Sequence, residues 1–411
     1  MKAINTILAL LTLLFLAGCN NGNGAAPDGS TDTGTGDADA DSDSDSDSDT
    51  DTNTLPYITD AGPWDWEPLP EMEDCGSWCR RITSEPDVLD FKWDVAERYV
   101  VYSNYQVQVV DYEELTTLKV PELHIEHPMI PGSAAGLFPA VDNGIVFYTF
   151  TCFDMQHLFR EIAIVDLTEQ YQVVVDSYPY GGNEEMPAPM ENDLRYPLAA
   201  SLYGCTSYQD PNLCNNDVSL HGPATSLGAL GPWSNTIWGD YLVFLQNGPF
   251  GDVRGYRYST QEFFDITNDD EIQFAPRLQG SLVVYQDLRL GDSTLEGDWN
   301  HSSIWLYDIE TEQTTQITDG SSIADNPDVF GDIVIWEDYR LCPDPQNKNQ
   351  FYCVEVFGRN LVTDVEFQIT DLPTYAKQPP PRIWGDKVFV HMYPPSGGSA
   401  LFVFDLPPEA Y

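Results

Sequence analysis

Basic side chains are scarce in this sequence. Its 411 residues include 18 Lys and Arg against 66 Asp and Glu, which gives a formal net charge of -48. A nucleic acid would meet electrostatic repulsion on such a chain, because its phosphates are normally neutralised by clustered Lys and Arg side chains. We therefore predict no nucleic-acid partner.

Long apolar segments are also lacking, apart from one short run near the N-terminus. Residues 7–16 (ILALLTLLFL) follow Lys2 and are too few to span a membrane, but they have the length of the apolar part of a signal peptide. The run leads into residues 16–19 (LAGC), which resemble a bacterial lipobox. We expect residues 1–18 to be a lipoprotein signal peptide, and Cys19 to carry the lipid that anchors the protein to the membrane.

The residue after the lipidated cysteine indicates the compartment. Asn20 stands there rather than Asp, which by resemblance to enteric sorting favours the outer membrane. We therefore predict an outer-membrane lipoprotein of the bacterial cell envelope, on either its periplasmic or its cell-surface face.

Apolar periodicity is absent from residues 19–55, which alternate Asp with Ser, Ala or Thr over residues 37–52. Such a segment cannot bury a core and repels itself, so we predict a disordered acidic tether. Asp37, Asp39 and Asp41 have the spacing of calcium ligands, but the Gly and Glu of an EF-hand loop are missing. We predict no cofactor and keep calcium binding as an alternative.

The remainder, residues 56–411, carries a repeat. Residues 326–340 (NPDVFGDIVIWEDYR) contain an extended run, a Gly-Asp turn and a β-branched run, which is the pattern of a hairpin. Two further short strands follow at residues 354–361 and 367–370, so the unit has four strands. Similar units begin near residues 94, 138, 238, 276 and 381.

The last unit stops before its fourth strand, whereas a matching segment precedes the first unit. Residues 81–83 (RIT) resemble residues 316–318 (QIT) and 368–370 (QIT), which are fourth strands elsewhere. An N-terminal strand that completes the last unit is typical of a β-propeller. The predicted fold class is therefore all-β, a six-bladed β-propeller whose last blade is closed by the N-terminal strand.

One interval of the repeat is too long. Gly144 and Gly239 are about twice as far apart as the other equivalent glycines. Residues 177–231 lie in this interval and are rich in proline and poor in β-branched side chains, which disfavours strands. We predict a long loop insertion at about 177–231, with seven blades as the alternative.

These repeats resemble the TolB-like six-bladed β-propeller family over residues 79–406, through an aromatic-Gly-Asp turn, Tyr-Asp-Ile and Gln-Ile-Thr. The resemblance implies the fold but no single activity, because such propellers serve as binding modules, scaffolds and enzymes. The Gly-x-Ser-x-Gly elbow of the hydrolase domain found beside some of these propellers is missing from the chain.

Seven cysteines remain after Cys19 is lipidated, in a compartment that permits disulfides. We favour Cys342–Cys353, which bracket a loop between neighbouring strands, and also expect Cys205–Cys214 and Cys75–Cys79. Cys152 is left over and could replace either member of the Cys205–Cys214 pair. A zinc site at residues 75–79 lacks a second pair of ligands.

Two charged pairs recur at one place in the repeat. Asp287 with Arg289, and Asp338 with Arg340, each follow a second strand. A repeated feature of this kind favours an ion pair that holds the blade's own loop, and ligand contact is the weaker interpretation. The His cluster at residues 124–127 (HIEH) is better explained as solvated loop. We assign no catalytic residue and no metal ligand.

Three functions fit these observations. The first is a lipid-anchored module that binds or scaffolds a protein or glycan partner. The second is a polysaccharide-active lyase or hydrolase working at the mouth of the propeller channel, and the third is a calcium-bound adhesion protein. The identity of the ligand is not encoded in any pattern of the sequence.

Overall fold

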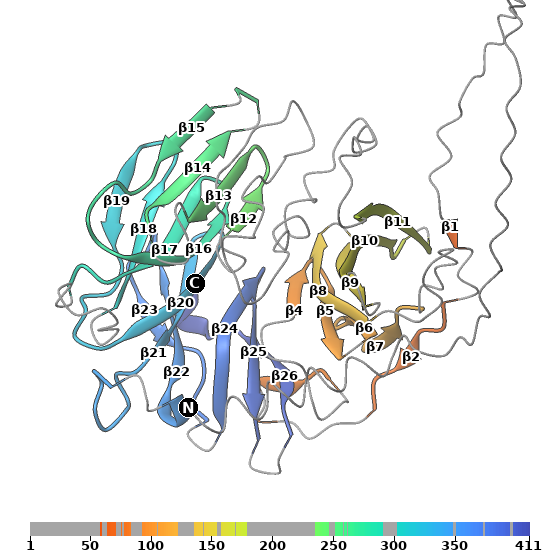
Figure 1. Ribbon diagram of the computed structural model, residues 1–411. Helices are drawn as coiled ribbons and strands as arrows, with labels where there is room; N and C mark the ends of the chain where they lie inside the picture. Colours follow the sequence, from red (N-terminus) through yellow and green to blue (C-terminus); the bar gives the residue numbers. More distant parts are fainter. Residues whose placement is uncertain are drawn as a thin grey trace, which may run out of the picture.

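The computed structural model describes residues 58–59, 64–70, 75, 78–83, 93–121, 135–178 and 235–411, apart from 105, 143, 154–157, 169, 246–250, 258, 261, 291–301, 348–350, 373–374 and 395–397. The described residues are almost all in antiparallel β-strands, with short 3-10 turns at η3 (Phe351–Cys353) and η4 (Pro408–Ala410) (Figure 1). No helix among them has the length and hydropathy needed to cross a bilayer. The signal peptide, Cys19 and the acidic tether lie outside these residues.

The strands of the described residues form six sheets, each built around three or four strands that follow one another in the chain. The first three sheets are β4 (Trp93–Ala96), β5 (Tyr99–Asn104), β6 (Gln106–Asp111) and β7 (Thr116–Lys119); β8 (Ala135–Asp142), β9 (Ile145–Phe153), β10 (Leu158–Asp166) and β11 (Tyr171–Tyr178); and β12 (Asn235–Trp238), β13 (Tyr241–Leu245), β14 (Val253–Arg257) and β15 (Glu262–Asp265). The next two are β16 (Gln273–Gln279), β17 (Leu282–Asp287), β18 (Ser303–Asp308) and β19 (Gln313–Gln316); and β20 (Ala324–Phe330), β21 (Ile333–Asp338), β22 (Glu355–Asn360) and β23 (Glu366–Gln368).

The sixth sheet joins the two ends of the described chain. It contains β24 (Ala376–Trp384), β25 (Lys387–Tyr393) and β26 (Ala400–Asp405), and its fourth strand is β3 (Cys79–Arg81) from the N-terminal side. β3 pairs antiparallel with β26, with Cys79 opposite Phe404 and Arg81 opposite Phe402. This is the pairing that the sequence predicts for residues 81–83.

The recurring Ile-Thr of the repeat has a structural explanation. In three sheets the threonine hydroxyl accepts a hydrogen bond from the backbone N–H of the first or second residue of the third strand. These bonds join Val253 to Thr267, Ile304 to Thr318 and Val356 to Thr370, at 2.8 to 2.9 Å. Thr83 does the same for Leu401 at 3.1 Å, so the N-terminal segment performs the role of a fourth strand in the sixth sheet.

The tight turn after each first strand follows from a residue with positive φ. Gly331, for example, has φ +56° and begins the turn between β20 and β21. Glycine adopts this conformation without the steric penalty that other residues suffer, and its twist suits a two-residue hairpin. Gly239, Gly280 and Gly385 hold the same place in three other sheets.

The first strands of the sheets lie next to one another around the centre of the molecule. β12 contacts β16, β16 contacts β20, β20 contacts β24, β24 contacts β4 and β4 contacts β8. Figure 1 shows these strands following one another around its middle, with the later strands of each sheet farther out. This radial arrangement is that of a β-propeller. We call the line about which the first strands are arranged the central axis.

Two details differ from the sequence prediction. β1 (Ile58–Thr59) pairs with β11 and β2 (Glu67–Pro68) pairs with β7, so the first two sheets each gain a fifth strand that no repeat signals. The insertion predicted from residue 177 begins later, since β11 continues to Tyr178. The rest of it, residues 179–234, lies outside the described residues, so the number of blades stays a prediction.

Candidate functional site

The first repeated charged pair is fully engaged within its own blade. Asp287 ends β17 and its side chain has no exposed surface. Arg289 binds this carboxylate with Nε at 2.9 Å and Nη2 at 2.6 Å, and its backbone N–H donates to the same group at 2.7 Å. The guanidinium also lies over the ring of Trp305, 4.3 Å from its centre. Hydrogen bonding to Asp287 raises the pKa of Arg289 above its usual value, against the effect of desolvation.

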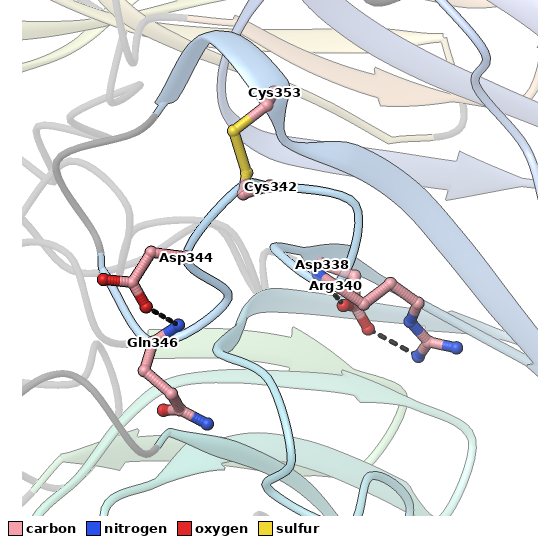
Figure 2. Close-up of a disulfide and its surroundings, with 6 residues drawn as sticks. All are labelled: Asp338, Arg340, Cys342, Asp344, Gln346 and Cys353. Atoms are coloured by element: carbon pink, nitrogen blue, oxygen red, sulfur yellow. Dashed lines mark hydrogen bonds and ion pairs between the residues drawn. A yellow bond between two sulfur atoms is a disulfide. The ribbon is translucent and has the colours of Figure 1, made fainter.

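The second pair repeats this geometry in the next blade (Figure 2). Asp338 is completely buried at the end of β21 and accepts bonds from Arg340 Nη2 at 2.6 Å and from the Arg340 backbone N–H at 2.8 Å. Trp336 Nε1 and Ser322 Oγ donate to it as well, each at 2.8 Å. A carboxylate with so many donors is a structural anchor for its loop, because little of it is left for a ligand.

Two of the expected disulfides are present. Cys342–Cys353 ties the polar loop between β21 and β22, beside the Asp338–Arg340 pair, as Figure 2 shows. Cys75–Cys79 closes a small loop at the start of β3. Cys205 and Cys214 lie outside the described residues, as does the side chain of Cys152.

A different set of charged residues lies on the central axis. Asp94, Arg277, Asp328 and Arg382 occupy the same position in their sheets, three residues before the turn that ends the first strand. Side chains of a strand alternate between its two faces, so residues at the same distance from equivalent turns lie on the same face of their sheets and at the same height along the axis. Arg277 and Arg382 act on the pKa of Asp94, and the other three residues act on the pKa of Arg382, as expected for neighbouring side chains. We call them the axial layer.

A bulge in the first strand aims three of these side chains. The pairing register shifts just before Arg277, Asp328 and Arg382, in β16, β20 and β24 respectively. Each is preceded by a proline, at 276, 327 and 381. A proline fits inside a bulge because it has no N–H to contribute to the ladder, and a bulge commonly redirects the side chains beside it.

Two members of the axial layer are paired. Arg277 Nε lies 3.3 Å from Asp328 Oδ1, which joins β16 to β20. Asp328 also accepts backbone hydrogen bonds from Val329 at 3.0 Å and from Ile383 of β24 at 3.0 Å. Asp328 therefore links three consecutive blades, and its charge is compensated by the protein itself.

The other two members have no ion-pair partner among the described residues. Arg382 donates to the backbone oxygen of Pro381 at 3.3 Å, and its Nε is buried without an acceptor. Asp94 accepts a hydrogen bond from the backbone N–H of Val141 in the next blade, at 3.2 Å. Although Arg382 and Asp94 influence each other electrostatically, no contact within ion-pair distance joins them.

Desolvation governs both of these groups. It lowers the pKa of Arg382 to about 10, and the neighbouring Arg277 acts in the same direction. It raises the pKa of Asp94 above its usual value, against the attraction of Arg277 and Arg382. Both side chains nevertheless keep some accessible surface. A shifted pKa together with some accessible surface is expected of a group that protein encloses on most sides but leaves open on one side.

Aromatic rings lie at the turn ends of three first strands, two of which, β20 and β24, also carry members of the axial layer. Trp238, Phe330 and Trp384 each precede the turn by one residue. Their ring centres are 5.0 Å apart for Phe330–Trp384, 5.8 Å for Trp238–Trp384 and 6.4 Å for Trp238–Phe330. Because these residues come from β12, β20 and β24, the cluster spans the axis and covers the axial layer on that side.

No metal centre emerges in the part of the chain that the structure describes, where no group of three or more His, Cys, Asp and Glu could hold an ion. His391 is buried on β25, 5.6 Å from the ring of Tyr393. The cluster at residues 124–127 and the other three histidines lie outside the described residues. Asp37, Asp39 and Asp41 lie outside them too.

No protein-family model matches the chain, and no curated protein sequence does. Among solved structures, TolB from Acinetobacter baumannii is 13% identical, covering 75% of this chain and 62% of that chain with a TM-score of 0.34. Oligogalacturonate lyase in complex with manganese is 11% identical, covering 86% and 97% with a TM-score of 0.41. The β-propeller domain of the Trilobed protease from Pyrococcus furiosus is 9% identical, covering 79% and 95% with a TM-score of 0.40.

Propellers of the TolB type are thus among the structures that this chain resembles, as the sequence repeat predicts. Proteins of this group perform different tasks, and similarity at this level carries no inference about which one this chain performs. The chemistry of the axis has to be judged from its own residues.

Sequence reasoning found the paired charges and missed the axial layer. The paired charges stand out in the sequence because they recur, at Asp287 with Arg289 and at Asp338 with Arg340. The structure explains this recurrence, since each pair anchors the loop of its own blade. The axial layer is visible in the sequence as one aligned position, three residues before each turn, where a charged residue follows proline in three units. Its variation from blade to blade is the signal that could have revealed it.

Proposed function

We propose that the protein is a lipid-anchored binding module of the bacterial cell envelope, which recognises a protein or glycan partner through the central axis of its propeller. The observation that carries this proposal is Arg382, an enclosed guanidinium without a carboxylate partner among the described residues. A charge held in this way costs stability in the free protein, and a bound ligand that pairs with it offsets this cost.

The loops of two neighbouring blades are held rigidly, which favours binding. The Asp287–Arg289 and Asp338–Arg340 pairs and the Cys342–Cys353 disulfide fix the loops of neighbouring blades. A rigid framework that holds a few unsatisfied polar groups in place lowers the entropic cost of binding. The lipobox at residues 16–19 and the acidic tether then supply the attachment to the envelope.

Partner capture tests the recognition half of the proposal. The full chain, kept oxidised and immobilised through its C-terminus, is exposed to envelope proteins and to a panel of envelope glycans. We expect retention of a defined partner that is lost in the Arg382→Gln variant and kept in Arg254→Gln, whose arginine pairs with Asp265 on outer strands. Turnover of a polysaccharide without stable retention would favour the enzyme alternative instead.

Lipid labelling tests the anchoring half. Cells that express the full chain are fed a radiolabelled fatty acid, and the protein is recovered from the membrane fraction. We expect label in the wild type and none in Cys19→Ser, because a thioether to the diacylglyceryl group needs the cysteine sulfur. Equal labelling of the two proteins would refute the assignment of Cys19.

A further inference from the structure

The axial layer also indicates the chemical class of the ligand. This inference rests on the proposed function and deepens it, because it concerns the same site. Arg382 has five N–H donors, of which one has an acceptor among the described residues, the backbone oxygen of Pro381. A guanidinium presents its donors in a planar fork that matches a carboxylate or a phosphate. The vacant donors therefore call for an anion.

A second guanidinium lies close enough to strengthen this requirement. Asp328 pairs with Arg277 and also accepts a hydrogen bond from the backbone N–H of Ile383, the residue after Arg382, so it holds Arg277 beside the strand of Arg382. Together with desolvation, which is the larger cause, repulsion by Arg277 lowers the pKa of Arg382. Asp328 takes the Nε group of Arg277 and leaves the Nη groups without a hydrogen bond among the described residues. Two like charges brought together in an enclosed place are stabilised when an anion lies between them.

The acidic members of the layer do not cancel this attraction. Asp328 is occupied by Arg277 and two backbone N–H groups. Burial raises the pKa of Asp94, so its protonation costs less than in water, and the protonated carboxyl group carries an O–H donor. A neutral Asp94 would offer that donor to an anion bound by Arg382, whereas the surrounding chain, at a net charge of -48, repels anions at long range. Binding must therefore come from short-range contacts.

The aromatic cluster defines how the anion is oriented. Trp238, Phe330 and Trp384 cover the turn side of the layer, so a ligand reaches the guanidinium groups from the opposite end of the first strands. Their rings can pack against a flat apolar body that carries the charge. We propose that Arg277 and Arg382 bind the carboxylate of a small ligand on the central axis, with Asp94 as an additional hydrogen-bonding partner and the aromatic cluster beneath it.

Benzoate is a suitable probe, because it joins a carboxylate to a flat ring, and benzamide is its uncharged counterpart. Each is titrated into the oxidised full chain at constant ionic strength, with calorimetry and tryptophan fluorescence as readouts. We expect saturable binding of benzoate at one site per chain, a change in the emission of Trp238 and Trp384, and no saturable binding of benzamide.

Three variants locate the site. Arg382→Gln should weaken benzoate binding by about tenfold to a hundredfold, because it removes a charge-assisted pair of hydrogen bonds. Asp94→Asn should tighten it, because the amide is always neutral and donates an N–H, whereas Asp94 must first take up a proton before it can donate to the anion. Arg254→Gln should leave it unchanged; its side chain is 27% exposed, close to the 25% of Arg277, but it pairs with Asp265 away from the axis. Thermal melting confirms that each variant is folded.

The outcomes separate this inference from the proposed function. Equal benzoate affinity in the wild type and in Arg382→Gln would overturn the inference, as would weaker binding in Asp94→Asn or the absence of saturable binding in the wild type. Inorganic phosphate bound more tightly than benzoate would overturn the choice of carboxylate. If benzoate behaves as expected while partner capture fails, the axial site stands and the envelope binding module does not.

Discussion

Two sets of Asp and Arg residues in this propeller differ in whether their side chains form ion pairs. At the outer end of the second strands, Asp338 and Arg340 are bound to each other and to further donors, and the next blade copies the arrangement with Asp287 and Arg289. On the axis, Arg382 and Asp94 lie near each other without an ion pair. The same residue types are thus structural where the repeat copies them and, in our proposal, bind a ligand where it does not.

The largest effect is expected from removing a repeated carboxylate. Asp338→Ala leaves Trp336 Nε1, Ser322 Oγ and the Arg340 guanidinium without their shared acceptor, which should lower the free energy of unfolding by about 3–5 kcal/mol. Urea denaturation measures it. Asp364→Ala, which removes the 74% exposed partner of Arg359, should cost less than about 1 kcal/mol. Equal losses in the two variants would break the comparison.

The disulfide beside this anchor should have the next largest effect. Replacing both Cys342 and Cys353 with Ser is expected to lower the free energy of unfolding by about 2–4 kcal/mol, because the unfolded chain regains the freedom of the closed loop. Denaturation of the double variant gives the value, and the wild type under reducing conditions is the check. A stability that does not change in either case would mean that the loop is held by Asp338 and Arg340 alone.

The closing strand gives a smaller effect. Thr83→Val leaves the buried N–H of Leu401 without its acceptor and should cost about 1–3 kcal/mol. Thr318→Val removes the same kind of bond to Ile304 in an ordinary blade, so the two losses should be similar. If Thr83→Val is neutral while Thr318→Val is not, the N-terminal strand contributes less than its register indicates.

The smallest effect concerns pH and belongs to the axis. Because burial raises the pKa of Asp94 in the folded protein, this group stabilises the fold when protonated, and that contribution is lost as the pH rises through the folded pKa. Asp94→Asn should therefore melt at a higher temperature than the wild type in neutral buffer, and the difference should shrink on acidification. A difference that grows in acid would show that Asp94 is stabilised as a carboxylate.

The propeller could be predicted because its signals are periodic. The Gly-Asp turns, the β-branched runs and the Ile-Thr segments repeat, and the structure shows a physical role for each, such as the bond from Leu401 to Thr83. The strands β1 and β2 were missed because two residues of pairing leave no pattern in a sequence.

The axial layer escaped prediction for a different reason. Asp94 and Arg382 are 288 positions apart in the chain, and what defines them is a shared level on neighbouring first strands. A prediction of this kind needs the repeat aligned residue by residue, including the bulge that precedes Arg277, Asp328 and Arg382. That Arg382 has no ion-pair partner among the described residues depends on distances, which no alignment supplies.

The pairing of β3 with β26 also affects how the chain folds. Thr83 and Leu401 are separated by 318 residues, so the sixth sheet cannot be completed until almost the whole polypeptide has been synthesised. Contacts over such separations form slowly, because a long loop must close before they contribute any stability. Until then β3 has no strand to pair with, and it is available to other extended chains. A protein exported through a membrane would pass this stage outside the cytoplasm. There β3, which is made early and pairs late, is the strand that needs protection.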